Sequence, residues 1–271
     1  MAFTDNCDLY VAIHEDGLNL TLKQLMLQRP SLFNYATADI IAEPSSWCQP
    51  VASSAEVTRR RDPLFTEVSP IPVYGVVPPL VSLSLCVQID RIEIDLHPGN
   101  LIGLPSQLNP PLQEQCFALH LHLCGGIGCP DDAALEAVPV RPAPKKDEAQ
   151  PAPPVHVPGQ ILCFCLDGYA VGHVECQCIL NKQSYVGKVD RVEITDIRPD
   201  GLESNFECYI KTAVNILLRH RLAIPLETIF FSFPLFNIIM VNLAPTPNPP
   251  VANNPSIDED QLKSFVTITA V

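Results

Sequence analysis

Apolar and polar residues alternate most clearly between residues 81 and 96. Val81, Leu83, Leu85, Val87 and Ile89 occupy alternate positions, and the apolar phase then shifts to Ile92, Ile94 and Leu96. Because side chains alternate between the two faces of a strand, a shift of one residue requires one extra residue in that strand. The pattern predicts one long strand with a β-bulge or sharp bend near Asp90 and Arg91.

The segment that contains this shift occurs twice, as residues 88–101 and 188–202. In both copies an apolar residue precedes Asp-Arg, apolar-Glu-Ile follows, and a turn with Pro and Gly leads to Leu. The second copy has one extra residue before its Pro. Each copy predicts a strand end, a tight turn and an entry into a helix. Adjacent strand residues point to opposite faces, so we interpret both Asp-Arg pairs as bulge elements with cross-strand partners.

Several other segments have the periodicity of strands or helices. A helix over residues 18–29 carries leucines on two sides, which predicts burial on both. Strands are predicted at 7–13, 113–123 (ended by Gly125-Gly126), 185–197, up to 243, and 264–270, with a hairpin of 160–166 and 174–179. The longest predicted helix covers 200–222, with a stripe formed by Phe206, Ile210, Val214 and Leu217.

Two regions lack such periodicity. Residues 31–79 are rich in Pro and Ser, and they contain the basic run Arg59-Arg60-Arg61, interpreted as a solvated loop, and a short edge strand within 68–77. Residues 130–158 are rich in Pro and Ala and predict an extended, mobile linker. We treat residues 1–271 as a single wrapped domain that contains this linker.

Composition excludes some classes of function. The 271 residues are 47% hydrophobic and 17% charged, which is typical of a globular protein. The net charge of -13 argues against a nucleic-acid partner. The longest apolar run, 228–243, is interrupted by polar residues and Pro, so we expect no membrane span. The polar start of the chain and its 11 cysteines predict a cytoplasmic protein with mostly unbridged, buried thiols.

Two groups of residues have metal-ligand chemistry. His120, His122 and Cys124 share one strand face with Cys129 close by, and this pattern fits either a zinc site or plain surface residues. In the predicted hairpin, Cys163 and Cys165 would face Cys176 and Cys178. These four could bind zinc, form cross-strand disulfides, or serve as small buried apolar residues, and we favour the last interpretation.

The sequence offers no pattern of catalysis. It contains no Gly-rich phosphate loop after a strand and no nucleophile elbow. Glu93 and Asp95 share a strand face, where carboxylates are normally solvated. We therefore expect no enzymatic activity, no catalytic residues and no cofactor.

The order of elements, together with the strand-to-helix junctions at 94–101 and 194–202, resembles the tubular lipid-binding (TULIP) superfamily. The resemblance implies an α+β fold in which a long, strongly curved antiparallel sheet wraps around two hydrophobic helices. It further implies an apolar groove for acyl chains or a hydrophobic segment of a partner, with bacterial members found near toxin genes as the nearer analogy. The linker and the loop before Val81 have no counterpart in it.

These observations predict a non-enzymatic binding protein for a lipid-like ligand or a hydrophobic protein segment. Apolar contact would come from the helix stripe and from strand residues facing it. The expected groove residues are Leu85, Val87, Phe117, Leu119, Leu121, Phe206, Ile210, Val214 and Leu217. The alternative is a structural or assembly subunit of a larger complex, such as an injection apparatus, without a small ligand. Oligomeric state is not predicted by the sequence.

Overall fold

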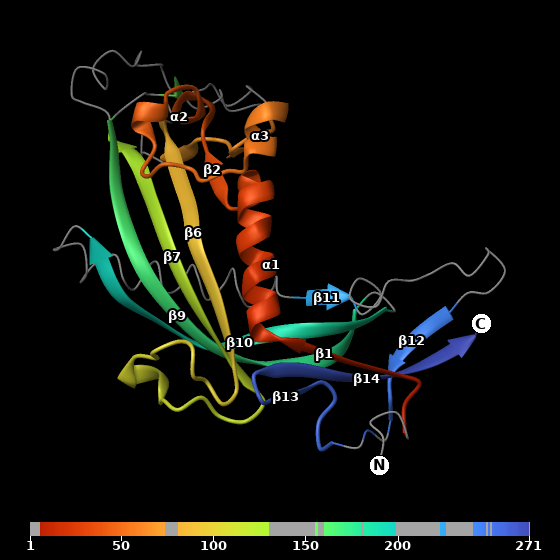
Figure 1. The fold of residues 1–271 in the computed structure, drawn as a ribbon. Coiled ribbons are helices and arrows are strands. Elements are labelled where there is room, and N and C mark those ends of the chain that lie inside the picture. The colour runs from red at the N-terminus through yellow and green to blue at the C-terminus, as the bar shows by residue number, and fades with distance from the viewer. Residues whose placement is uncertain are drawn as a thin grey trace, which may run out of the picture.

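The computed structural model describes residues 6–73, 81–129, 155–156, 160–179, 182–198, 223–225, 241–247, 249 and 251–270. Within these residues the protein is mixed α+β, mostly strands in antiparallel sheets with few helices. The long strands bend along their length, and helix α1 (Glu15–Gln28) stands beside them (Figure 1). The predicted fold class is therefore confirmed in its coarse form. The predicted helix at 200–222 lies outside the described residues, so a wrap around two helices remains a prediction.

The largest sheet has seven strands in the order β11-β10-β9-β7-β6-β2-β3. All neighbouring strands are antiparallel except β2 and β3. The strands in chain order are β2 (Asn34–Ala36), β3 (Thr66–Glu67), β6 (Leu85–Leu96), β7 (Cys116–Cys129), β9 (Gln160–Ile179), β10 (Lys182–Arg198) and β11 (Ala223–Pro225).

Two smaller sheets and several short helices complete the described structure. In one sheet β14 pairs with β1, β12 and β13, and in the other β5 lies between β4 and β8. The strands are β1 (Leu9–His14), β12 (Val241–Pro245), β13 (Ser256–Asp258), β14 (Gln261–Ala270), β4 (Ile71–Val73), β5 (Val81–Leu83) and β8 (Val155–His156). The helices besides α1 are η1 (Pro30–Leu32), α2 (Ala38–Ala42), η2 (Pro44–Ser46), α3 (Ala55–Arg60) and η3 (Ser106–Leu108).

The predicted bulge is confirmed in both copies of the repeat. The register of β6 against β7 shifts between Ile89 and Arg91, and that of β10 against β9 shifts between Val189 and Arg191. Asp90 and Asp190 are thus the extra residues. The first bulge keeps all the alternating apolar residues of β6 on one face of the sheet, because it adds one residue where the apolar phase shifts. β10 has a second register shift between Ile194 and Asp196, which absorbs the extra residue of the second copy.

Two predictions about the central strands were wrong. β7 continues through Gly125 and Gly126 to Cys129. Residues 160–179 form the single strand β9, which pairs with β7 and β10, and not a hairpin. Glycine here allows close approach instead of a turn: a Cβ on Gly126 would lie 2.6 Å from Ile161 Cγ2, and one on Gly172 would lie 2.1 Å from the carbonyl oxygen of Lys188.

Helix α1 is confirmed, but its predicted burial on two sides is wrong. Glu15 is its only buried residue, and Leu20 is 60% exposed. The helix instead lies along the outer edge of β6. The Asn19 amide donates to the carbonyl of Ile94 (2.7 Å) and accepts from its N–H (2.8 Å), and Glu15 Oε2 accepts the N–H of Leu96 (2.7 Å). Side chains of α1 therefore satisfy backbone groups that an exposed strand edge would leave open.

Residues 31–73 have more regular structure than their periodicity predicts. The segment folds into short helices and strands around a core cluster that contains Ile40, Phe65 and Cys86. Arg59 and Arg60 end α3 and pair with Glu56 at 2.6 and 2.5 Å, so they do not form the predicted loop. Strand β4 confirms the predicted edge strand.

The described part of the predicted linker is β8, which pairs with β5. The rest of residues 130–158 lies outside the described residues. β8 is a short strand within the segment that the sequence predicts to be an extended, mobile linker.

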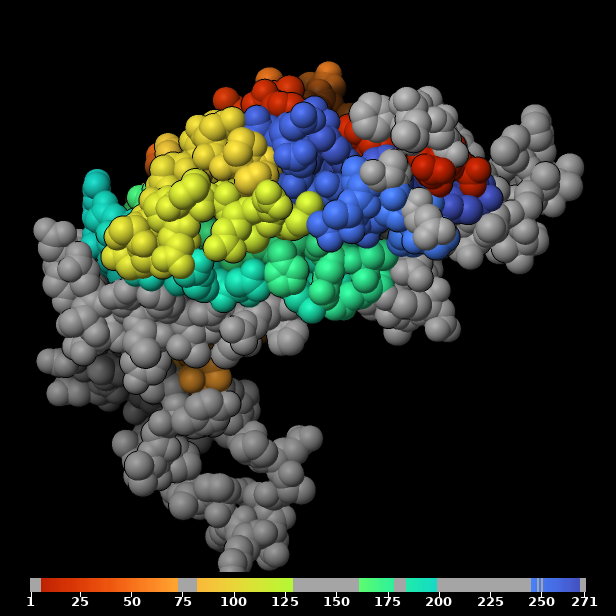
Figure 2. Space-filling model, turned by 90° about the horizontal axis from the view of Figure 1, so that it is seen from below, coloured from red at the N-terminus to blue at the C-terminus, as the bar shows by residue number. Residues whose placement is uncertain are grey.

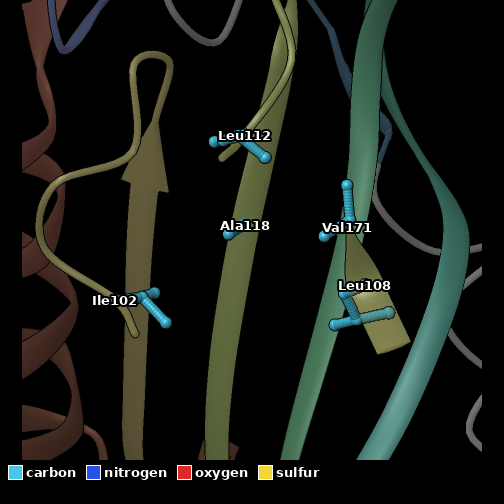
Figure 3. Close-up of a cluster of buried hydrophobic side chains, with 5 residues drawn as sticks. All are labelled: Ile102, Leu108, Leu112, Ala118 and Val171. Carbon is cyan, nitrogen blue, oxygen red and sulfur yellow. The ribbon is translucent and has the colours of Figure 1, made fainter. Parts of the chain in front are cut away.

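The loop after β6 covers the polar face of the main sheet. Its residues Ile102, Leu108 and Leu112 pack on Ala118 of β7 and Val171 of β9 (Figure 3). Seen from below, this yellow segment lies beside the blue C-terminal strands (Figure 2), in agreement with the backbone hydrogen bond that the Asp260 N–H donates to the His97 carbonyl (3.0 Å).

Asp95 anchors this loop and is not solvated as predicted. It is fully buried, and its carboxylate accepts the backbone N–H groups of Asn100, Leu101 and Ile102 at 3.3, 3.1 and 2.6 Å. Three donors in a turn thus compensate one buried charge.

Candidate functional site

A cavity of about 670 Å³ lies between α1, the segment 49–52 and the bulged part of β6. This volume is in the range of small-molecule sites. Its lining is mostly apolar. The lining residues are Asn19, Leu20, Lys23, Met26, Leu27, Phe33, Asn34, Gln49, Pro50, Val51, Ala52, Ile89, Asp90, Arg91, Ile92 and Glu93.

The bulge forms one wall of the cavity and leaves a strand edge there. Both backbone groups of Ile94 point toward α1, where they bond with Asn19. Residues two apart in an antiparallel strand direct their backbone groups to the same side. The N–H and C=O of Ile92 therefore point to this edge as well, beside the cavity. The cavity thus combines apolar side chains with backbone polar groups.

The charged groups of the lining differ in their partners. Asp90 hydrogen-bonds His122 Nδ1, and Glu93 Oε2 lies 3.1 Å from His120 Nδ1. Lys23 and Arg91 have no ion-pair partner among the residues that the structure describes. Both side chains are exposed. The cavity therefore presents two cations without a close ion-pair partner, together with the carboxylates of Asp90 and Glu93, beside an apolar interior.

His120 lies at the centre of the polar face next to the cavity. Its Nε2 is 2.8 Å from Asp167 Oδ1, so both ring nitrogens face a carboxylate, and the ring stacks on Tyr169 with centroids 4.6 Å apart. Burial, followed by the nearby Asp167 and Glu93 carboxylates, raises the pKa of Tyr169. With both nitrogens engaged, His120 has none left for a metal or for proton transfer to a substrate.

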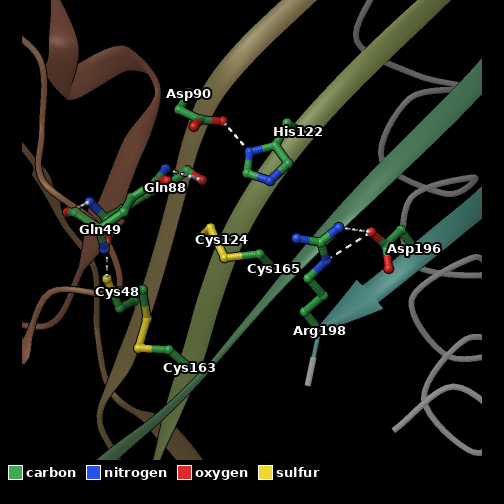
Figure 4. The surroundings of a disulfide bond; sticks show 11 residues. Cys48, Gln49, Gln88, Asp90, His122, Cys124, Cys163, Cys165, Asp196 and Arg198 are labelled. Atoms are coloured by element: carbon green, nitrogen blue, oxygen red, sulfur yellow. Dashed lines mark hydrogen bonds and ion pairs between the residues drawn. A yellow bond between two sulfur atoms is a disulfide. The ribbon is translucent and has the colours of Figure 1, made fainter. Parts of the chain in front are cut away.

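Four of the cysteines that the sequence predicted as thiols form two disulfides in the described structure. Cys48 bonds Cys163, and Cys124 bonds Cys165, its direct partner across β7 and β9 (Figure 4). The predicted pairing of Cys163 and Cys165 with Cys176 and Cys178 was wrong, because β9 carries all four on one strand. Two disulfides also remove the main reason for expecting a reducing compartment, and the cytoplasmic location remains a prediction.

Gln88 connects the segment that carries Cys48 to β6. Its fully buried amide accepts the N–H of Gln49 (3.0 Å) and donates to the Gln49 carbonyl (2.7 Å; Figure 4). This pair also fixes one wall of the cavity, since Gln49 lines it.

Two other thiols lie in places that suppress reactivity. Burial raises the pKa of Cys86, and burial together with the Asp190 carboxylate raises that of Cys116. Because the thiolate is the reactive form, both thiols are poor nucleophiles near neutral pH.

A possible metal cluster differs from both predicted sets. His122, Cys124 and Cys165 hold their ligand atoms within 4.8 Å of one another. The first two share a face of β7, as predicted, and Cys165 joins them from β9. In the disulfide form Cys124 and Cys165 carry no thiolate for a metal. The side chains of Cys129 and Cys178 lie outside the described residues, as do Phe206, Ile210, Val214 and Leu217.

The predicted groove residues on the strands do not meet at the large cavity. Leu85 and Val87 are half-buried, and Phe117 is packed in a core cluster with Leu96 and Ile257. Leu119 and Leu121 line a separate cavity of only about 20 Å³. Sequence reasoning missed Lys23, the segment 49–52 and Gln88. The only available signal was the phase shift at Asp90, which marked the bulge that borders the cavity.

The chain matches no protein-family model and no curated protein sequence. Among the described residues, none of the helices has the length and apolar character needed to cross a membrane.

Proposed function

We propose that the protein binds an amphiphilic anion, such as a fatty acid or another acyl chain with an acidic head, in the cavity between α1 and β6. The observation that carries this proposal is the combination in one cavity of an apolar lining with Lys23 and Arg91, which lack ion-pair partners in the described structure. The function is non-enzymatic.

Each part of the ligand has a physical counterpart in the cavity. Leu27, Phe33 and Ile89 supply apolar area, and burial of a chain against such residues is favourable by roughly 0.8 kcal/mol per methylene. The exposed cations at the rim would attract a carboxylate or phosphate while that head stays in contact with water. Asp90 and Glu93 oppose this attraction less than free carboxylates would, because each is engaged by a histidine.

The proposal retains the function implied by the resemblance to the TULIP superfamily but moves the groove. The predicted groove faced the helix at 200–222, whereas the proposed one uses α1 and the outer edge of β6. Membership in that superfamily is itself part of the proposal, supported by the bent strands with a helix beside them (Figure 1).

The first test is native mass spectrometry of the purified protein, followed by solvent extraction and lipid analysis. We expect a co-purifying acidic lipid near one per chain. Titration with a fluorescent fatty acid then measures affinity directly. A bare protein that also fails to bind the probe would overturn the proposal.

Two variants, each of which replaces an alanine with tryptophan, localise the site. Ala52→Trp places an indole in the cavity, and we expect it to weaken probe binding at least ten-fold. Ala55→Trp is the matched control, because Ala55 is also exposed but does not line the cavity. Equal affinities for the two variants would place any ligand elsewhere.

Charge variants test the head group. The double substitution Lys23→Gln with Arg91→Gln should weaken the binding of a fatty acid by about three- to five-fold for each exposed charge that is removed. The affinity for the matching fatty alcohol should be unchanged. Equal loss for acid and alcohol would contradict the proposed role of the cations.

The alternative is an assembly subunit without a small ligand. It is favoured by exposed apolar side chains on several elements, including Leu101, Leu162 and Ile268 at 50, 61 and 43% exposure. The same mass spectra decide between the two, because this alternative expects a bare chain at a multiple of the monomer mass.

A further inference from the structure

We propose that reduction of the Cys124–Cys165 disulfide creates a zinc site formed by Cys124, Cys165 and His122. This inference does not depend on what occupies the cavity. It rests on three ligand atoms that already lie within 4.8 Å of one another on two paired strands.

The scaffold fixes the three ligands. His122 and Cys124 are two residues apart on β7, so their side chains share a face. Cys165 is the direct partner of Cys124 on β9, and Cys124 is buried. Zinc takes thiolate sulfur at about 2.3 Å and imidazole nitrogen at about 2.0 Å. Separated sulfurs and the imidazole need only side-chain rotation to reach such distances.

Asp90 orients the imidazole ring of His122 for zinc binding. It bonds Nδ1, which leaves Nε2 as the ligand nitrogen, and Figure 4 shows the ring with Asp90 on one side and the disulfide below it. A carboxylate behind the ligating histidine is the usual arrangement at zinc sites, where it fixes the ring and raises its basicity. The bulge at Asp90 thus brings a carboxylate to the position that a zinc-bound histidine requires.

Two cations neighbour the site. Arg198 is the partner of Cys165 on β10, and its guanidinium pairs with Asp196 at 2.8 Å. Arg91 is the partner of His122 on β6, and its side chain is exposed to water, which screens its charge. Two thiolates and one neutral imidazole would fill three of the four tetrahedral positions, and a water or small anion would take the fourth.

The redox step is balanced by a dithiol reductant. The reductant gives two electrons and two protons to the Cys124–Cys165 bond and becomes a disulfide itself. The two thiols then lose their protons as Zn²⁺ binds. Oxidation reverses the sequence and expels the ion.

The test compares oxidised and phosphine-reduced protein for binding of Zn²⁺, and of Co²⁺ as a spectroscopic substitute. We expect one ion per reduced chain, with the sulfur charge-transfer and visible bands of tetrahedral cobalt, and none per oxidised chain. Zinc binding to the oxidised chain, or no 1:1 binding to the reduced chain, would overturn the proposal. If reduction unfolds the protein, Zn²⁺ should restore its circular dichroism, and failure to do so also overturns it.

Variants assign the ligands under the same reducing conditions. His122→Ala should weaken zinc binding at least ten-fold and simplify the cobalt spectrum. Asp90→Asn should weaken zinc binding about ten-fold, because the His122 ring loses the carboxylate that orients it. Cys48→Ser with Cys163→Ser is the matched control, because it removes two nearby sulfurs that are not ligands. Full retention by His122→Ala, or equal loss in the control, would place the ion elsewhere.

Discussion

The two copies of the repeat build the same bulge and then use it differently. In each, the extra Asp contacts a histidine on the neighbouring strand: Asp90 with His122, and Asp190 with His173 at 2.9 Å. After this point the copies diverge. The first continues with one buried carboxylate, Asp95, which holds three backbone N–H groups. The second has a second bulge at Thr195, and its corresponding carboxylate, Asp196, is half-buried and pairs with Arg198.

The surroundings differ more than the copies themselves. The first bulge borders a cavity, helix α1 and two disulfides, whereas the second borders the Cys116 thiol and contacts η3 through Arg191, whose guanidinium donates to the Leu108 carbonyl (3.2 Å). The repeated sequence therefore specifies the same β-bulge in both strands, and the residues around each bulge determine what can bind beside it.

The largest expected difference concerns the cysteines beside each bulge. Cys48→Ser with Cys163→Ser opens a loop with a sequence separation of 115 residues, which in the chain-entropy model costs about 5 kcal/mol. Cys116→Ser, beside the second bulge, should cost less than about 1 kcal/mol because no cross-link is lost. Urea unfolding without reductant measures the free energy of unfolding of both variants, and similar losses would contradict the disulfide between Cys48 and Cys163.

Asp95 and Asp196 give the next contrast. Asp95→Ala removes the acceptor of three backbone donors, and we expect a loss of about 3 kcal/mol. Asp196→Ala, at the matching position of the second copy, removes only a solvent-accessible ion pair with Arg198 and should cost less than about 1 kcal/mol. If chemical denaturation finds equal changes, the loop after β6 does not depend on its buried carboxylate.

The edge contact of α1 should have a smaller effect. Asn19→Ala breaks both hydrogen bonds to the Ile94 backbone, at an expected cost of about 2 kcal/mol. Thr21→Ala on the same helix loses only a bond to the Gly17 carbonyl within the helix and serves as the control, within about 0.5 kcal/mol. Thermal unfolding of the two variants should rank them in this order.

Glu15 gives the smallest effect, and one that depends on pH. Burial raises the pKa of Glu15, an effect partly offset by the Leu96 N–H that it accepts. A raised pKa means that the folded state binds the proton more tightly than the unfolded state, so stability falls as pH rises above the unfolded value of 4.5. Glu15→Gln lacks this loss, and its stability relative to the wild type should rise from pH 4 to pH 7. A relative stability that falls over this range would contradict the burial effect.

Local patterns predicted the parts of the fold that depend on local rules. The phase shift located the bulge at Asp90, since alternation is set by the backbone itself. The same rules failed where glycine was involved: Gly125-Gly126 was expected to end a strand, yet both lie inside β7, where Gly126 allows a close approach of Ile161. Residues 160–179, which contain Gly168 and Gly172, were expected to form a hairpin and are one strand. The resulting false hairpin then paired the wrong cysteines.

The candidate site could not be predicted for a different reason. Its walls come from four separate segments, around Lys23, Asn34, Pro50 and Arg91, and no spacing within one segment indicates that they meet. The exposed leucine at position 20 was read as buried because its periodicity is that of a core residue.

The Cys48–Cys163 bond also determines how the oxidised chain behaves when it is cut. A protease that cleaves once anywhere between these two positions leaves both fragments joined, so the chain keeps its full mass on a non-reducing gel and separates only after reduction. Between Cys124 and Cys163 a single cut is bridged by both disulfides. Nicking in that interval therefore leaves one covalent ring, formed by residues 48–124, residues 163–165 and both disulfides, and releases no part of the protein.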